Sequence, residues 1–263
     1  MFTRIMVSAL ILSTLFFCEL PSNAAARTAT TARQSSDLNP TAMSILKQMS
    51  DYLVSLNRFT VHVDSMMDVI TRSNMTLIAD KEMDVYVQRP NKLRVDSFVP
   101  DRNRQIFYDQ CTITMYSPDK KLYTVIPAPP TIPQTIAAAR AKGVEMPLAD
   151  LLDADPYKAI SARARHAYYI GMSRVGGVNC RQLAFRGTDM DWQIWVQSGQ
   201  TPLVRRVVII DRGVKGSPRF VATLSNWNLS PSFTDSTFQF VPPADAHKIP
   251  FASVRPSIPR RSK

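Results

Sequence analysis

Apolar and polar residues alternate in many short runs along this chain, a pattern typical of β-strands. Four such runs follow one another between residues 178 and 229, and only a few turn-forming residues separate them: VNCRQLAF, DWQIWVQ, PLVRRVVIID and RFVATLSNWNLS. This spacing predicts an antiparallel meander. In the second run Trp192, Ile194 and Val196 alternate with polar residues, but Trp195 breaks the alternation. We therefore expect apolar side chains on both faces of the sheet.

The N-terminal half begins with a helical pattern. Asn39 can cap a helix and Pro40 can occupy its first turn, and apolar residues then recur at helical spacing from Ile45 to Leu56. This predicts an amphipathic helix of about four turns. Strand patterns follow at residues 59–63, 77–87, 93–99, 106–108, 112–116 and 122–126.

The middle of the chain is helical. Several prolines between residues 127 and 133 end the strand region, and a helix is predicted at 134–142, with Gly143 where a helix C-terminus favours a left-handed residue. Further short helices are predicted at 148–152 and 156–165. A strand at 167–172 and a turn at Gly176 and Gly177 then lead into the meander.

Helices segregated from one large antiparallel sheet predict an α+β fold. A sheet of about eleven strands must curl, so we expect an unclosed β-barrel, or half-barrel, whose helices cover the concave face. The alternation predicts which side chains line an apolar cavity there, with Gln193 and Arg206 on the opposite face. The predicted lining comprises Leu77, Val85, Leu93, Trp192, Ile194, Val207 and Ile209.

Residues 1–26 have the features of a cleaved secretory signal: Arg4, an apolar stretch from 5 to 17, and small residues at 24–26. The apolar stretch is too short to span a bilayer, which argues against a membrane anchor. Cys18 raises the alternative of an acylated lipoprotein, but the bulky Phe17 before it argues against that. We predict export to the periplasm, a disordered lead-in at 27–37, a domain at 38–249 and a basic, Pro-rich tail at 250–263.

The chain carries 32 Lys and Arg against 21 Asp and Glu, a net charge of +11. For an exported protein this charge favours an anionic membrane surface as partner. The basic residues are dispersed and lack aromatic interleaving, so nucleic acid is not expected as a partner. Arg205 and Arg206 lie beside an apolar strand, and we predict that they contact an anionic head group at the rim of the cavity.

Two cysteines, Cys111 and Cys180, remain after the predicted cleavage. Disulfides persist in the periplasm, so this pair could form a bridge if their strands were neighbours. The alternative is two thiols that behave as small apolar residues.

No pattern of catalytic residues is present. The segment Gly171-Met172-Ser173-Arg174-Val175 lacks the second glycine of a nucleophile elbow, and metalloprotease and phosphate-loop motifs are absent from the sequence. His166 is interpreted as part of a basic helix end. Asp150, Asp153 and Asp155 are interpreted as helix-terminal carboxylates rather than metal ligands. We therefore expect no enzyme, no metal and no cofactor.

Several segments carry a resemblance to a known family. These are MSDYL at 49–53, RPNKLR at 89–94, LADLL at 148–152, the stretch from Cys180 to Arg186, DWQIW at 191–195 and SNWNL at 225–229. Together they resemble a family of predicted periplasmic proteins of unknown function, which in turn resembles the LolA/LolB lipoprotein-carrier superfamily. The resemblance covers about residues 38–249. It implies a half-barrel with helices over its mouth and a cavity for acyl chains. The chain departs from its relatives at Asp109-Gln110-Cys111, where they have Asp-Gly-Lys.

Two functions are consistent with these observations. The first is a monomeric carrier or sensor that holds lipid or lipoprotein acyl chains without chemistry, and it is favoured. The second is an exported hydrolase or transferase that acts on an acyl or lipid substrate. An envelope protein-interaction scaffold is a third, because a fold alone does not define a function.

Overall fold

The computed structural model describes residues 37–144 and 146–251, which belong to one of the two units into which the chain divides. The predicted signal sequence, all but the last residue of the lead-in and most of the basic tail lie outside the described residues. No helix in the described part is long and apolar enough to cross a bilayer.

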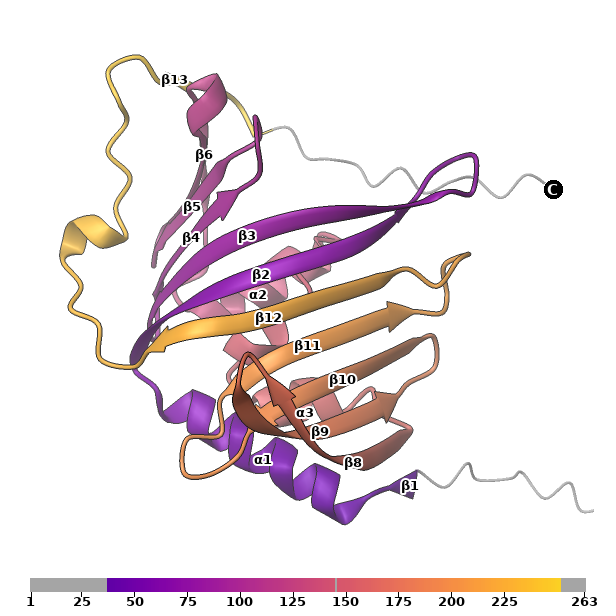
Figure 1. Cartoon of the computed structure of the whole chain (residues 1–263). Helices are drawn as coiled ribbons and strands as arrows, with labels where there is room; N and C mark the ends of the chain where they lie inside the picture. The colour runs from indigo at the N-terminus through magenta and orange to yellow at the C-terminus, as the bar shows by residue number, and fades with distance from the viewer. Residues whose placement is uncertain (1–36, 145, 252–263) are drawn as a thin grey trace, which may run out of the picture. The chain divides into compact units, whose positions relative to one another are not determined.

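One sheet dominates the fold, and its thirteen strands follow the order β1-β8-β9-β10-β11-β12-β2-β3-β4-β5-β6-β7-β13 (Figure 1). The first and last strands pair on one side only, so the sheet is not closed. The strands are β1 (Asp37–Leu38), β2 (Arg58–Ile70), β3 (Thr76–Gln88), β4 (Lys92–Phe98), β5 (Arg104–Asp109), β6 (Thr112–Ser117), β7 (Leu122–Pro127), β8 (His166–Val175), β9 (Val178–Arg186), β10 (Met190–Gln197), β11 (Val204–Asp211), β12 (Arg219–Asn228) and β13 (His247–Lys248).

The eleven longer strands, β2 to β12, pair antiparallel with their neighbours, whereas β1 and β13 are two-residue parallel additions at the edges. The predicted α+β half-barrel of about eleven strands and the predicted meander are therefore confirmed. The sheet has two runs of consecutive strands, β8 to β12 and β2 to β7. They meet where β12 pairs with β2 in the middle of the sheet.

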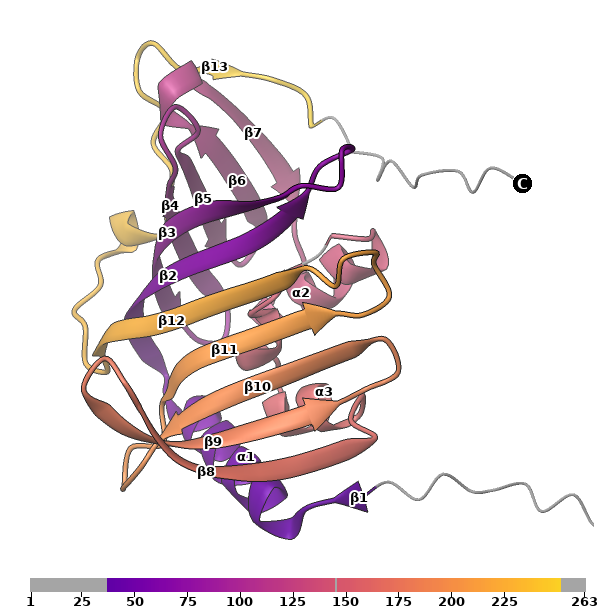
Figure 2. The same ribbon diagram turned by 45° about the vertical axis from the view of Figure 1, so that its right-hand side comes forward.

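Three α-helices lie on the concave side of the sheet (Figure 2): α1 (Pro40–Ser55), α2 (Ile132–Ala141) and α3 (Pro156–Ser161). The Asn39 side chain caps α1 by accepting a hydrogen bond of 3.0 Å from the Ala42 amide, as the sequence predicts. A short 3-10 helix, η2 (Ala149–Leu152), lies between α2 and α3. Two more 3-10 helices, η1 (Pro118–Lys120) and η3 (Asp235–Thr237), complete the elements.

The predicted third helix was too long. It ends at Ser161, because the Arg165 amide donates to the Arg186 carbonyl and the chain joins the sheet as β8. His166 is therefore the first residue of a strand, where its ring stacks near Tyr168 with centroids 6.4 Å apart, and not part of a helix end.

Two turns between neighbouring strands contain residues with positive φ angles. Gly176 and Gly177 have φ of 54° and 80°, as the tight turn between β8 and β9 requires. Gln110 has φ of 74° between β5 and β6, in the left-handed region that favours glycine. The Asp109 carboxylate accepts from the Cys111 and Thr112 amides and supports this turn without a glycine.

The main core lies between α1 and the concave face of the sheet. Ile45, Leu46, Met49 and Leu53 of α1 are buried against inward-facing residues of β2 and β8 to β12. A bulge in β12 at Asn226, with φ of 49°, turns Trp227 toward this core, where its indole nitrogen donates to the Val204 carbonyl. The SNWNL segment thus joins two strands of the meander.

The convex face of β4 to β7 is covered by the C-terminal segment. The Phe240 ring lies 5.0 to 5.5 Å from the rings of Phe107, Tyr116 and Tyr123, and Lys92 pairs with Asp235 at 2.9 Å. This side of the half-barrel is therefore a second packed layer.

Candidate apolar ligand site

The predicted lining residues divide into two groups. Trp192, Ile194 and Val207 face the concave side and are buried in the main core beneath α1, while Gln193 bonds with Gln182 on the convex side. Trp192 stacks on Phe185 with the two rings 5.6 Å apart. These three side chains are packed against helices and do not line an open space.

The other four predicted residues lie nearer to open solvent. Val85, Leu93 and Ile209 are half-buried against the edge of the core, and Leu77 is 46% exposed. Two surface pockets, one lined by α1 and residues 154–157 and one lined by β2, β3 and β12, include none of the seven predicted residues. Of these four residues, Leu77 and Ile209 therefore belong to an open surface, whereas Val85 and Leu93 pack against the core.

An open apolar surface continues beyond the core along the concave face of β2 and β3. The register pairs Met67 with Phe220 and Val69 with Leu77, all on the side of β2 that carries the buried Val63. Met67 and Leu77 are 48% and 46% exposed, so the helices leave this part of the concave face of β2 and β3 uncovered. We call this surface the open trough, and define it by Met67, Val69, Leu77, Ala79, Met83, Ile209 and Phe220.

One cation points into the open trough. Lys81 lies on the same side of β3 as Leu77 and Met83. Burial lowers its pKa, and no described carboxylate forms an ion pair with it. The acidic residues of this hairpin alternate with the trough residues and lie on the opposite, convex face: Asp64, Asp68, Asp80, Glu82 and Asp84. An ammonium group in an apolar surface can bind the anionic end of an otherwise apolar ligand.

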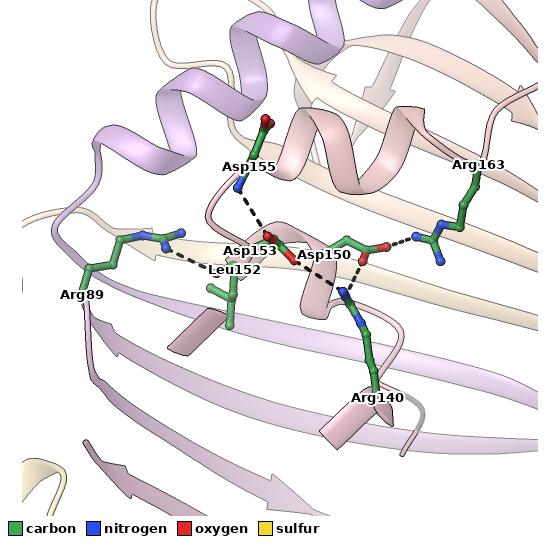
Figure 3. A network of polar contacts seen from close by, with 7 residues as sticks. All are labelled: Arg89, Arg140, Asp150, Leu152, Asp153, Asp155 and Arg163. Atoms are coloured by element: carbon green, nitrogen blue, oxygen red, sulfur yellow. Dashed lines mark hydrogen bonds and ion pairs between the residues drawn. The ribbon is translucent and has the colours of Figure 1, made fainter. Parts of the chain in front are cut away.

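Helix α2 packs against the main core, to which Val85 and Leu93 also pack. Ile132 and Ile136 are buried in the main core, and Thr131 caps the helix. Figure 3 shows the ion pairs that hold its C-terminal end: Arg140 contacts Asp150 of η2 and also Asp153 at 3.4 Å. Asp150 contacts Arg163 as well. A single carboxylate therefore links α2, η2 and the segment after α3.

Arg89 brings two of the family segments together. Its Nη1 donates to the Leu152 carbonyl at 3.4 Å (Figure 3), so RPNKLR contacts LADLL. Its Nε and Nη2 are buried without a hydrogen-bond partner, and burial lowers the pKa of the guanidinium. This contact positions η2, and through Asp150 it also positions the end of α2.

The three aspartates have the structural roles expected of them. Asp155 caps α3 by accepting from the Lys158 amide at 2.9 Å. Asp150 and Asp153 bind arginine side chains.

The alternation correctly predicted Arg206 on the convex face, and this placement contradicts the separate prediction that Arg205 and Arg206 contact a head group at the rim of the cavity. Arg206 lies on the convex face with its guanidinium 5.8 Å from the Trp195 ring, and Arg205 bonds with Gln197. Trp195 breaks the alternation because it forms a separate convex cluster with Val175 and Cys180. Arg206 alternates with the concave Val207, and the register shift between Trp195 and Val196 places Arg205 on the convex face as well, so neither arginine reaches the concave rim.

Cys111 and Cys180 are free thiols in the structure. Cys111 precedes β6 and Cys180 belongs to β9, and seven strands lie between β9 and β6 in the sheet order. The bridge considered from the sequence is therefore not formed.

A family model described as "Predicted periplasmic protein (DUF2092)" matches residues 42–252. The chain belongs to this family. The resemblance noted from the sequence is thus confirmed, and the protein is periplasmic, as the family description states. No curated protein sequence matches the chain.

Solved structures are similar at low sequence identity. An uncharacterized conserved protein from Thermus thermophilus aligns with a TM-score of 0.49 and 10% identity, over 80% of this chain and 99% of that one. Lipoprotein LppX from Mycobacterium tuberculosis aligns with a TM-score of 0.45 and 12% identity, over 74% of this chain and 98% of that one. The LolA superfamily protein NE2245 from Nitrosomonas europaea aligns with a TM-score of 0.40 and 14% identity, over 76% of this chain and 97% of that one.

Most of the open trough was missed from the sequence. Met67, Val69, Lys81 and Phe220 were not proposed as site residues. The available signal was the length of the apolar alternation: β2 and β3 each run for 13 residues, longer than the strands beside them. Strands that extend past their helices leave their inward-facing residues exposed.

Proposed function

We propose that this periplasmic protein binds the acyl chain of a lipid or lipoprotein in the open trough, as a non-enzymatic carrier or sensor. The observation that carries the proposal is the concave surface of β2 and β3 from the core to Leu77, which is apolar except for Ser65 and Lys81 and of which Met67, Val69 and Leu77 are more than a third exposed. Exposed apolar surface of this kind marks a site of interaction. Membership of a periplasmic family supports a ligand from the cell envelope.

The chemistry of the trough favours an anionic amphiphile. Each methylene removed from water contributes about 0.8 kcal/mol, so about six methylenes supply about 5 kcal/mol before the costs of ordering the chain. The apolar side chains do not select a head group. Lys81 supplies that selection by pairing with a carboxylate or phosphate, a role that the sequence had suggested for Arg205 and Arg206.

Movement of α2 would lengthen the trough. The helix buries Ile132 and Ile136 in the main core, and its displacement would expose Leu93 and Val85. The prolines before α2 and Gly143 after it allow the helix to move as a lid, and this movement is part of the proposal. Arg140 and its two aspartates act as the latch that keeps the lid closed.

The test is binding of dansyl-labelled undecanoic acid to the purified protein, followed by fluorescence. Leu77→Asp and Met67→Asp should each weaken binding at least tenfold, because a charge on the trough repels an acyl chain. Val54→Asp is the matched control, since Val54 is 43% exposed on α1 and lies outside the trough. Equal losses in all three variants, or no binding by the unmodified protein, would refute the proposal.

The role of Lys81 is tested separately with the methyl ester of the same probe. Lys81→Met should weaken binding of the acid and leave binding of the ester unchanged. Lys81→Arg keeps the positive charge and should bind the acid as the unmodified protein does. Hydrolysis of the ester by the unmodified protein would instead favour an acyl hydrolase.

A further inference from the structure

Four loops meet at one end of the sheet, and we call this the hairpin end (Figures 1 and 2). They are the β2–β3 loop (71–75), the β11–β12 loop (212–218), the β9–β10 loop (187–189) and the segment before β8 (162–165). The antiparallel order requires that alternate connections lie at the same end.

Contacts between these loops show that they form one surface. A Cβ on Gly216 would lie 3.1 Å from Ile70 Cδ1, and Arg219 pairs with Asp68 at 2.9 Å, so the β11–β12 and β2–β3 hairpins are adjacent. The Arg212 amide donates to the Asp189 carbonyl at 2.7 Å. A Cβ on Gly187 would lie 2.9 Å from the Arg163 carbonyl, which joins the fourth loop to the other three.

The hairpin end is basic, and the other end of the same strands carries little charge. The four loops contain five cations and one acid: Arg72, Arg163, Arg165, Arg212, Lys215 and Asp189. At the opposite end the loops at 56–57, 176–177 and 198–203 contain no Lys, Arg, Asp or Glu, and the turn at 89–91 contains only the largely buried Arg89. Among the described residues, Arg72 and Lys215 have no ion-pair partner, so their charges are available to a ligand.

Large apolar side chains accompany these charges. Met75 and Val214, in the two adjacent hairpin loops, are 55% and 48% exposed, and Ile78 nearby is 61% exposed. Apolar side chains at loop tips beside cations suit the boundary between head groups and acyl chains, where charge contacts phosphate and apolar groups insert. Lipid is thus the partner whose chemistry matches both features.

We propose that the hairpin end docks on an anionic phospholipid bilayer, with Met75 and Val214 inserting and Arg72 and Lys215 contacting phosphate. The proposal rests on the proposed function, because the open trough runs along β2 and β3 toward this end. Docking in this orientation turns the mouth of the trough toward the membrane, so that an acyl chain can move between them without crossing water.

The experiment is flotation of the purified protein with vesicles of phosphatidylethanolamine and phosphatidylglycerol, compared with vesicles of phosphatidylcholine alone. Binding should favour the anionic vesicles and fall with added salt. Arg72→Glu with Lys215→Glu, and separately Met75→Asp with Val214→Asp, should each reduce anionic-vesicle binding at least tenfold. The matched controls are Arg58→Glu and Val54→Asp, which change exposed residues away from the hairpin end.

The outcomes separate docking from acyl-chain binding. If the unmodified protein does not float with anionic vesicles, or if the control variants lose binding as much as the hairpin variants, docking is refuted. The Arg72→Glu, Lys215→Glu variant should still bind the dansyl probe, which also shows that it is folded. If the unmodified protein floats but does not bind the probe, the proposed function fails and the docking surface remains.

Discussion

Replacing Arg140 with alanine should open the α2 lid. Arg140 is 39% exposed, and its partners Asp150 and Asp153 are 18% and 27% exposed. Partly exposed ion pairs contribute about 0.5 kcal/mol each, so losing two shifts the lid equilibrium by about 1 kcal/mol. This corresponds to an open population about fivefold larger. The Arg163 pair with Asp150 is retained, so η2 keeps one of its anchors.

Hydrogen exchange followed by mass spectrometry measures this change. Peptides that cover α2 should already exchange faster than those of the β9–β12 meander, because α2 has few buried side chains. In Arg140→Ala they should exchange about fivefold faster again, while the meander is unchanged. The dansyl probe should also bind more tightly if opening the lid lengthens the trough.

Lys47→Ala is the control for this experiment, because it removes an exposed ion pair with Asp51 on α1 and leaves α2 untouched. Unchanged exchange in α2 for Arg140→Ala would show that the ion pairs are not a latch. Equal acceleration in the meander would show that the substitution loosens the whole domain, which would also contradict the reasoning.

Three further predictions concern stability and accessibility. Asn39→Ala should lower the free energy of unfolding in urea by about 1 kcal/mol, because it removes the α1 cap, whereas Ser44→Ala on the exposed side of α1 should change it little. Asp84, at 2.7 Å, raises the pKa of His62, with help from Asp64. Protonated His62 therefore stabilises the fold below its ordinary pKa of about 6.5, and the contribution is lost as pH rises through the raised value. His62→Asn should cost about 0.5 kcal/mol at acidic pH and less at alkaline pH, and a constant difference would contradict this. Cys111 is exposed and Cys180 is buried, so in the protein without residues 1–26, which lacks Cys18, a thiol reagent should modify one thiol in the native state and two after unfolding; no free thiol in the unfolded protein would show that they are bridged.

The sequence predicted the elements well because each had a local signal. Asn39 and Pro40 specify where α1 begins, and Gly176 and Gly177 specify a tight turn. The period of two along DWQIWV places Trp192 on the concave face and Trp195 on the convex face. These features depend only on residues that are close in the sequence, so they can be predicted without knowledge of the tertiary structure.

The candidate site was predicted less well because it depends on packing between distant segments. Alternation shows on which face Trp192 and Leu77 lie, but not that α1 covers the first and leaves the second exposed. The convex placement of Arg205 depends on a bulge between β10 and β11, and bulges have no reliable local pattern. The contact of Arg89 with Leu152 joins segments that no sequence periodicity relates.

The pairing of β12 with β2 has a consequence for the order in which the protein folds. Residues 219–228 are made long after residues 58–70, so the long β2 strand has a partner on only one side during most of synthesis. An unpaired strand edge with apolar residues such as Met66 and Met67 is a template for aggregation. A fragment that ends before Arg219 should therefore self-associate, whereas the whole chain closes its own most vulnerable edge with one of the last strands it makes.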